Sequence, residues 1–546
     1  MASRINIGPE NGPYVAINES SGNLQLEDNS GNVVAEWDET NAQWDFANNT
    51  LNNVDALNSN SVKTEVSRTT GTEDITLNVP TDYGDWQSAV DAASEYSYRS
   101  GVEILINIES GHEVSENLTI RDLTLPHVKI QSEADTVGVE DGFTGDLIDI
   151  RRSVAPVIDT TFDMGGDGTN GIVCKENSMI QVTRDNGVDN AGNDCIALEW
   201  NAFADLRGTE WTGAGRRCLD AHQLVSISGQ DIVLDNAGAR GCRLGNCVKA
   251  NFQDGTVTNH GSTGINLAHN SDVTLRRGDI SGNGGVGLDL EECCRADLTD
   301  ATVEDNLNEG IELDLCEIYA EGATVSGNGE QGVRAVNSIT NVRDAVIEGN
   351  DEEGVRQVGG HLTAASAEIK NNGDEGIHTD RGVTADLRFA VVELNAGGVL
   401  ADDSTLMSLR NASVVNNLGT GVEIAGSSQV NMEDATVDDN DSLGVGLNDG
   451  SSAAVDGVTI TNNGGTALNL SFSCSAGGGD VTITDNGNHG VQCNRGSTAA
   501  FTGQIENNDG DDVRCRRGSI IAVHGLTYGD RNISTNTLTS DGVIFE

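Results

Sequence analysis

An asparagine recurs through half of this chain with an almost constant spacing. Successive members lie 22, 23 or 24 residues apart, and most are followed a few residues later by Gly and then Val or Ile. The series is Asn236, Asn259, Asn283, Asn306, Asn328, Asn350, Asn372, Asn395, Asn417, Asn440, Asn463, Asn486 and Asn508. A repeat of this length constrains the architecture more strongly than any local pattern does.

Each repeat contains short segments in which apolar and polar residues alternate. Ile311 and Leu313 are separated by Glu312, for example, and Asp314 follows. A period of two residues indicates a strand with one buried and one solvated face. The repeats hold no stretch long enough for the helix of a helical repeat. Three short strands and three turns fill a unit of this length, so we predict an all-β fold, a parallel β-helix of about 22–24 residues per coil.

The asparagines are interpreted as scaffold. Asparagine tolerates left-handed backbone and favours turns, and equal spacing places each one above its predecessor, about 4.8 Å away. Stacked amides can then form an internal hydrogen-bonded ladder. At about 4.8 Å per coil, this stretch alone predicts a rod roughly 60 Å long.

The composition is strongly acidic. The chain has 86 acidic and 31 basic residues, a formal net charge of −55, and only five lysines among its 546 residues. High charge with modest hydrophobicity ordinarily indicates disorder, but the strict repeat places the few apolar residues where a core needs them. A folded surface of this kind resembles those of proteins from extremely halophilic archaea and their viruses. Nucleic acid is disfavoured as a partner because phosphate contacts require Lys and Arg.

The cysteines follow the coil period. Eleven are present, and several should lie in neighbouring coils: Cys195, Cys218 and Cys242; Cys293 and Cys316; Cys493 and Cys515. Either they fill a column of the core as small apolar residues, or adjacent pairs form disulfides, since neighbouring coils bring Cα atoms to about 5 Å. No CxxC pair occurs, and the sequence predicts no metal site and no cofactor.

The first residues have none of the features of a secretory signal, because Met1–Tyr14 lacks a basic start, an apolar run and a cleavage site. No run of about 18 apolar residues occurs anywhere, so we expect no membrane insertion. A cellular surface protein would need export, whereas a virion protein is assembled inside the cell. This reading favours a virion protein over a cellular surface protein.

Four segments are expected along the chain. Residues 1–66 have short alternating strands between Asn/Gly turns and form a small β-rich module that resembles the particle-attaching segment of viral fibres and spikes. Residues 67–101 are a connector and a capping helix, with Trp86, Val90 and Ala93 on one face and Asp82 or Asp85 at its N-cap. Residues 102–524 are the shaft, and residues 525–546 cap its free end.

The start of the shaft carries a family resemblance. A short helix, a strand at 102–108 and a glycine turn at Glu109–Glu113 are similar to the first coil of phage tail spikes and related pectate-lyase-like proteins. The resemblance implies that the β-helix is right-handed and that the protein is a homotrimer. It implies no particular reaction, because this fold serves lyases, hydrolases and non-catalytic fibres alike.

One outward column carries candidate catalytic residues. Asp289 and Glu312 are 23 residues apart, as are Glu291 and Asp314, so the four carboxylates should form a square on neighbouring coils. Such a pair could supply the acid and base of a glycoside hydrolase. The alternative is that a protein this acidic carries carboxylates everywhere. Lyase chemistry is disfavoured because lysine is nearly absent from the coils.

The same column continues through Arg334, Arg356 and His378 if the register holds. These residues would form a cationic strip able to bind acidic glycans of a cell surface. A subunit interface is a second interpretation. A third is that the strip balances nearby acidic residues, namely Glu330, Glu352 and Glu353.

We therefore expect a structural spike or tail-fibre protein of a haloarchaeal virus, on the virion surface in a high-salt, extracellular environment. It would attach to a host-surface glycan or glycoprotein, pack with copies of itself, and join other virion proteins through residues 1–66. One alternative is a tail-spike glycoside hydrolase, although the sequence favours a protein without enzymatic activity. Another is a capsid-mounted turret or decoration spike.

The charge yields a first prediction. In molar salt the Debye length is about 3 Å, so repulsion among the carboxylates becomes local. Dialysis from about 3 M to about 0.1 M salt should lower the melting temperature and cause loss of structure or assembly. Circular dichroism melts across that range measure the effect, and an unchanged melting temperature would contradict the halophilic interpretation.

Overall fold

The computed structural model describes residues 74–98 and 103–524. Beyond these ranges it describes only the backbone of eight strands: β1 (Ile5–Ile7), β2 (Val15–Ser20), β3 (Asn23–Glu27), β4 (Val33–Asp38), β5 (Gln43–Asp45), β6 (Thr69–Gly71), β57 (Leu538–Thr539) and β58 (Val543–Phe545).

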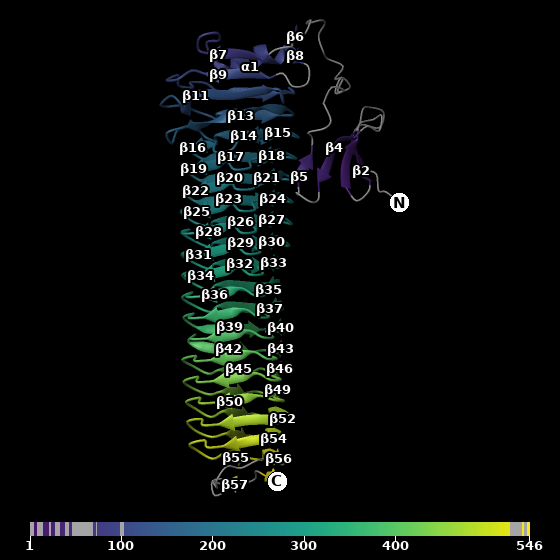
Figure 1. Ribbon diagram of the computed structural model, residues 1–546, viewed down its shortest axis with the longest axis vertical. Helices are drawn as coiled ribbons and strands as arrows, with labels where there is room; N and C mark the ends of the chain where they lie inside the picture. Colours follow the sequence, from purple (N-terminus) through teal and green to yellow (C-terminus); the bar gives the residue numbers. More distant parts are fainter. Residues whose placement is uncertain are drawn as a thin grey trace.

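The shaft is a stack of coils in which one parallel sheet of 51 strands winds around a single core (Figure 1). Most coils contribute three strands, and each strand pairs with its counterpart in the next coil. Thus β29 (Leu288–Glu291), β30 (Arg295–Asp297) and β31 (Thr302–Glu304) pair in parallel with β32 (Ile311–Asp314), β33 (Glu317–Tyr319) and β34 (Thr324–Ser326). The predicted parallel β-helix is confirmed.

One of the three strand files carries most of the residues considered below. Its members are β10 (Leu118–Arg121), β12 (Ile148–Arg151), β14 (Ile172–Lys175), β17 (Asp194–Glu199), β20 (Arg217–His222), β23 (Arg240–Gly245), β26 (Ile265–Ala268), β29, β32, β35 (Val333–Asn341), β37 (Val355–Thr363), β39 (Glu375–Asp380), β42 (Gly397–Ala401), β45 (Val422–Ile424), β48 (Val445–Leu447), β51 (Leu468–Ser471), β53 (Val491–Asn494) and β55 (Val513–Arg516).

The core follows from the alternation within these strands. In β29 and β32, Leu288, Leu290, Ile311 and Leu313 point inward and are fully buried, while the residues between them face outward. Each coil stacks its apolar residues on those of its neighbours, so the core is continuous along the shaft.

A single short helix covers the first coils. In α1 (Trp86–Ser94), the Asp85 side chain caps the helix by accepting a hydrogen bond from the Ser88 N–H at 2.7 Å. The helix buries Trp86, whose ring packs 5.5 Å from that of Phe162. The predicted helix and its Asp85 cap are confirmed. Strand β7 (Ile75–Val79) precedes the helix and already pairs in parallel with β9 (Ile104–Ile108).

The asparagine ladder is present over eleven coils. Each side-chain Nδ2 except that of Asn508 donates to the Oδ1 of the asparagine one coil later, and that Oδ1 also accepts the backbone N–H of the earlier residue. For Asn350 these bonds to Asn372 measure 2.9 and 3.1 Å. Asn508, the last member, donates to Asp512 instead. The members are Asn283, Asn306, Asn328, Asn350, Asn372, Asn395, Asn417, Asn440, Asn463, Asn486 and Asn508.

Asn236 and Asn259 were wrongly placed in this ladder. Both lie one position earlier in the turn, where the backbone is left-handed, with φ of 56° and 59°. The ladder position in those coils belongs to Ala237 and His260. The His260 Nδ1 accepts the Ala237 N–H at 2.9 Å, and the His260 N–H donates to Asn283 at 3.2 Å. The ladder asparagines themselves have ordinary backbone; the left-handed residue is the one before each of them.

The cysteine columns are correct only in part. Cys493 lies beside Cys515 as predicted, but Cys242 aligns with Leu219 rather than with Cys218. Cys316 lies beside Cys294, whose N–H points to its sulfur at 3.2 Å, while Cys293 is exposed in the turn. All eleven cysteines carry free thiols, and nine of them are buried. The core-filling interpretation therefore holds for those nine.

Strands β1–β5 form an antiparallel sheet of five strands in sequence order, a small β-rich unit as expected within residues 1–66. At the other end, β57 and β58 extend the parallel ladders of β55 and β56 (Ile520–Val523). Most of the expected cap at 525–546 lies outside the described residues. Within the described chain, no helix has the length and apolar character needed to cross a membrane.

The ladder yields a second prediction. Replacing Asn372 by Ala removes the acceptor of two Asn350 donors and two further bonds made by its own amide, to Ile347 O and Asn395. Since each buried group left unpaired costs about 1–3 kcal/mol, Asn372→Ala should lower the free energy of unfolding by about 3 kcal/mol.

Chemical denaturation at fixed high salt measures this loss. Asn488→Ala is the matched control, because its side chain is exposed two residues after a ladder asparagine. Equal stabilities for the two variants would show that the ladder is not a significant source of stability.

Candidate functional site

In the strand file that runs from β10 to β55, six outward residues form a continuous column across six coils, here called the polar file. Each residue is the direct neighbour of the next across parallel strands β26 to β39. Its members are Asn266, Asp289, Glu312, Arg334, Arg356 and His378. The register expected for these residues is therefore the one observed, and Glu291 also lies beside Asp314.

The square of carboxylates divides into two unlike pairs. Glu291 and Asp314 are exposed, whereas Asp289 and Glu312 are half-buried. Burial, reinforced by Glu291, raises the pKa of Asp289 to about 6, although an Asn266 hydrogen bond of 2.7 Å opposes the shift. Burial and the charge of Glu309 also raise the pKa of Glu312. Two adjacent carboxyl groups with raised pKa values are the residue types from which an acid–base pair is built.

The arginines of the file are not free positive charges. Arg334 forms an ion pair with Glu312, and Arg356 forms one with Glu353. Both guanidinium groups remain more than a third exposed. The two arginines of this face are therefore paired with carboxylates, rather than forming the free cationic strip that the sequence suggested. Glu353 is indeed a counter-charge, as one of the three alternatives proposed.

A second column runs beside the polar file. Each of its members lies two residues before the first inward-facing Ile or Val of its strand. This turn file comprises Glu309, Gln331, Glu353, Glu375 and Gly397. Glu353 is its most enclosed acid, since its side chain is only 4% exposed. Burial opposes ionisation there, but hydrogen bonds from His378, Gln331 and Arg356 outweigh it and lower the pKa of Glu353 to about 2. Glu353 is thus a fixed negative charge.

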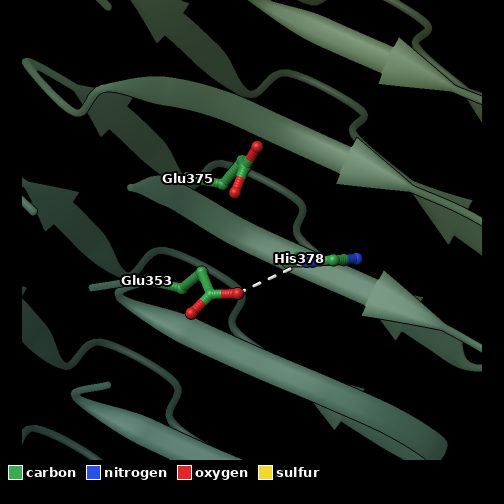
Figure 2. Close-up of side chains that lie close together, drawn as sticks. All are labelled: Glu353, Glu375 and His378. Atoms are coloured by element: carbon green, nitrogen blue, oxygen red, sulfur yellow. Dashed lines mark ion pairs between the residues drawn. The ribbon is translucent and has the colours of Figure 1, made fainter. Parts of the chain in front are cut away.

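Glu353, Glu375 and His378 converge between two coils (Figure 2). Each offers a ligand atom, and these atoms all lie within 4.8 Å of one another. The His378 Nδ1 is 3.4 Å from Glu353 Oε1, and the Gln331 Nε2 donates to the other Glu353 oxygen at 3.0 Å. Glu375 differs from Glu353, because burial and the adjacent Asp374 raise its pKa. Two carboxylates and an imidazole are a donor set that could hold a metal ion.

A pocket of about 160 Å³ opens beside Glu375. Its walls include the carboxylates of Asp374, Glu375 and Glu423. The pocket has space beside Glu375 because Gly397 has no side chain. A Cβ at Gly397 would lie 3.0 Å from the Glu375 Cγ and 3.5 Å from its Oε1. The polar file thus ends at a concave, acidic site.

The sequence interpretation included His378 but did not connect it with Glu353 and Glu375. Glu353 appeared only as a counter-charge, and Glu375 was not considered. A signal was available, since the two glutamates are 22 residues apart, one coil, and each lies two residues before a buried strand residue. The space that Gly397 leaves beside Glu375 could not be predicted from the pattern of charged residues, because it depends on a missing side chain.

The sequence matches a protein-family model described as a right-handed beta helix region, over residues 170–343 and 335–479. This match agrees with the right-handed winding that we predicted. Among curated proteins, none matches the sequence.

Several solved structures are similar in architecture. The Azotobacter vinelandii mannuronan C-5 epimerase AlgE4 A-module is 14% identical, with a TM-score of 0.24, and the match covers 70% of this chain and 94% of that one. The periplasmic alginate epimerase AlgG is 9% identical (TM-score 0.27; 65% and 78% covered). Bacteriophage CBA120 tailspike protein 3 is 10% identical (TM-score 0.20; 84% and 58% covered). Values this low carry no information about substrate or activity.

The raised pKa of Asp289 yields a third prediction. A carboxyl group whose folded pKa exceeds its unfolded value binds more protons when folded, so stability falls as pH rises from about 4 to about 6. Asp289→Asn keeps an acceptor for Asn266 and removes the buried charge. Its stability relative to the unsubstituted protein should therefore increase across that window and stay constant above it.

Denaturation curves at constant salt from about pH 4 to about pH 8 measure this difference. Asp194, whose pKa burial also raises to about 6, titrates in both proteins and cancels. Glu321→Gln, at an exposed position, is the control and should show no such trend. A stability difference for Asp289→Asn that is independent of pH would contradict the assigned shift.

Proposed function

The chain belongs to the right-handed β-helix family, and we propose that it is a rod-shaped attachment protein that binds a surface glycan along its polar file. In this proposal the protein is a virion spike or tail fibre of a halophilic virus, and the particle is held through the N-terminal β-rich unit. The glycan-binding part rests on the geometry of the file, and the virion part on the acidic composition and the rod.

The observation that supports glycan binding best is the pairing of charges along the file. Arg334 with Glu312, and Arg356 with Glu353, place a donor beside an acceptor on successive coils. Sugar hydroxyl groups donate and accept at once, so paired side chains of this kind recognise them without requiring net charge on the ligand. The coils repeat about every 4.8 Å, which matches an extended polymer better than a compact ligand.

The rod is suited to attachment for mechanical reasons. Its coils contact only their neighbours, so length can be added without altering the core. The strongly acidic surface keeps such rods soluble and apart at high salt. The homotrimer implied by the tail-spike resemblance and the contacts of residues 1–66 with other virion proteins remain parts of this proposal, as does the capsid-mounted alternative.

A tail-spike glycoside hydrolase is the second candidate, and one observation favours it. Asp289 and Glu312 are adjacent, half-buried carboxyl groups with raised pKa, and they lie on the same face as the proposed glycan path. A retaining hydrolase uses two carboxyl groups about 5 Å apart. The ion pair with Arg334 compensates the negative charge of the Glu312 carboxylate, which weakens Glu312 as a nucleophile or base.

Binding is tested with a matched pair of double variants. Glu312→Gln/Arg334→Gln removes an ion pair of the file. Asp386→Asn/Arg388→Gln removes a pair of 2.7 Å outside the file, at the end of strand β40 (Thr384–Asp386) and the turn after it. Envelope polysaccharides from halophilic archaea are fractionated into neutral and uronate-rich pools, and binding is measured calorimetrically at high salt. The file variant should bind at least about tenfold more weakly, the cost of one or two charge-assisted hydrogen bonds, and the control should bind normally.

Three results discriminate among the readings. Absence of binding to both pools, or equal binding by both variants, would overturn the glycan-binding proposal. New reducing ends in the same incubation, lost in Asp289→Asn and Glu312→Gln, would identify the hydrolase instead. Cleavage that persists in both variants would place the active residues elsewhere.

A further inference from the structure

We propose that Glu353, Glu375 and His378 bind one divalent transition-metal cation, of the class of Zn²⁺ or Mn²⁺, across two adjacent coils. Nothing in the glycan proposal requires this site, and its test uses the metal alone. The two proposals can therefore fail independently.

The geometry of the three donors fits a shared ion. Ligand atoms bound to one cation at about 2.0–2.2 Å lie about 3–4 Å from each other. The three atoms here already lie within 4.8 Å, and His378 Nδ1 is 3.4 Å from Glu353 Oε1. To close the set, the half-buried Glu375 side chain would have to move toward the other two donors. Glu353 and His378 come from adjacent coils, so the parallel ladder between β37 and β39 fixes their separation.

The local charge favours a cation. Glu353 is enclosed and ionised, and Glu375 lies beside Asp374 with Glu423 across the pocket. The neighbouring guanidinium group, that of Arg356, forms its ion pair with Glu353. Among the described residues Glu375 forms no ion pair, and a cation held between it and Glu353 would supply a counter-charge.

Arg356 is compatible with the metal. Its side chain is 36% exposed, and it contacts only one of the two Glu353 oxygens, the one nearest His378. Displacement of this guanidinium into solvent would free that oxygen for the cation. The other oxygen would stay bonded to Gln331, which holds the carboxylate in place.

The open coordination position would face the adjacent pocket, on the Glu375 side of the cluster. Metal sites that bind a further ligand use three protein donors and leave a position for water or another oxygen. Glu375 lines the 160 Å³ pocket, and the missing side chain of Gly397 leaves space directly beside its carboxylate. This space is a second feature, independent of the three donors, that points to a ligand here.

The donor set also selects the class of metal. Ca²⁺ and Mg²⁺ prefer shells of six or more oxygens, whereas imidazole nitrogen with carboxylate suits Zn²⁺ and Mn²⁺. The buried thiols elsewhere are inaccessible, but Cys247 and Cys293 are exposed and would bind Zn²⁺ on their own. The test therefore uses a Cys247→Ser/Cys293→Ser background.

The experiment is calorimetric titration of the chelator-treated full chain with Zn²⁺, and separately with Ca²⁺, at high salt. We expect one Zn²⁺ site per chain and weaker or undetectable Ca²⁺ binding. Glu375→Gln and His378→Ala should each weaken Zn²⁺ binding by more than about tenfold, because they remove direct ligands. Circular dichroism confirms that each variant is folded.

The controls resemble these variants in chemistry but not in place. Glu321→Gln removes an exposed carboxylate outside the pocket and the cluster, and His361→Ala removes an exposed imidazole of β37. Both should bind Zn²⁺ normally. The proposal is overturned if the background protein binds no Zn²⁺, if Glu375→Gln and His378→Ala bind as well as the background, or if the controls lose binding to the same extent.

Discussion

Parallel stacking in register is the interaction on which the whole shaft depends. Because each coil of the repeat is 22–24 residues long, every residue lies beside the residue that occupies the same position in the next coil. For asparagine this proximity is favourable, since an amide both donates and accepts. Eleven amides, ten of them buried, therefore satisfy one another and the turn backbone along the shaft. The ladder fixes the turn, and the turn fixes which residues of the next strand face outward.

The same constraint acts in the opposite way on charged residues. Identical charges one coil apart repel each other, and burial increases the cost. Burial raises the pKa of both Asp289 and Glu312, and nearby acids reinforce the rise: Glu291 acts on Asp289, and Glu309 and Asp289 act on Glu312. Where a base follows an acid, as at Glu312 and Arg334, an ion pair forms. The chemical character of the polar file is thus a consequence of which residue types the repeat places in sequence.

The period predicted the fold and the polar file because both depend only on spacing. Single-residue errors arose where two similar residues adjoin. Asn259 was chosen although His260 holds the ladder position, and Cys293 although Cys294 contacts Cys316. A spacing of 24 instead of 23 before Asn283 was the visible sign of the first error. Side-chain pairing was not predictable in the same way, since Arg356 could face several glutamates and only packing selects Glu353.

The cluster at Glu353, Glu375 and His378 shows how a β-helix can contain sites that the repeat pattern of its sequence does not predict. A file of large polar residues packs tightly as long as every coil contributes a side chain. At Gly397 the turn file loses its side chain, and a pocket opens beside the last acid of the file. An interruption of the repeat of this kind leaves space beside side chains that the stack holds in place, and binding chemistry can develop there. The relevant feature is therefore the break in the pattern, next to residues that the pattern has already brought together.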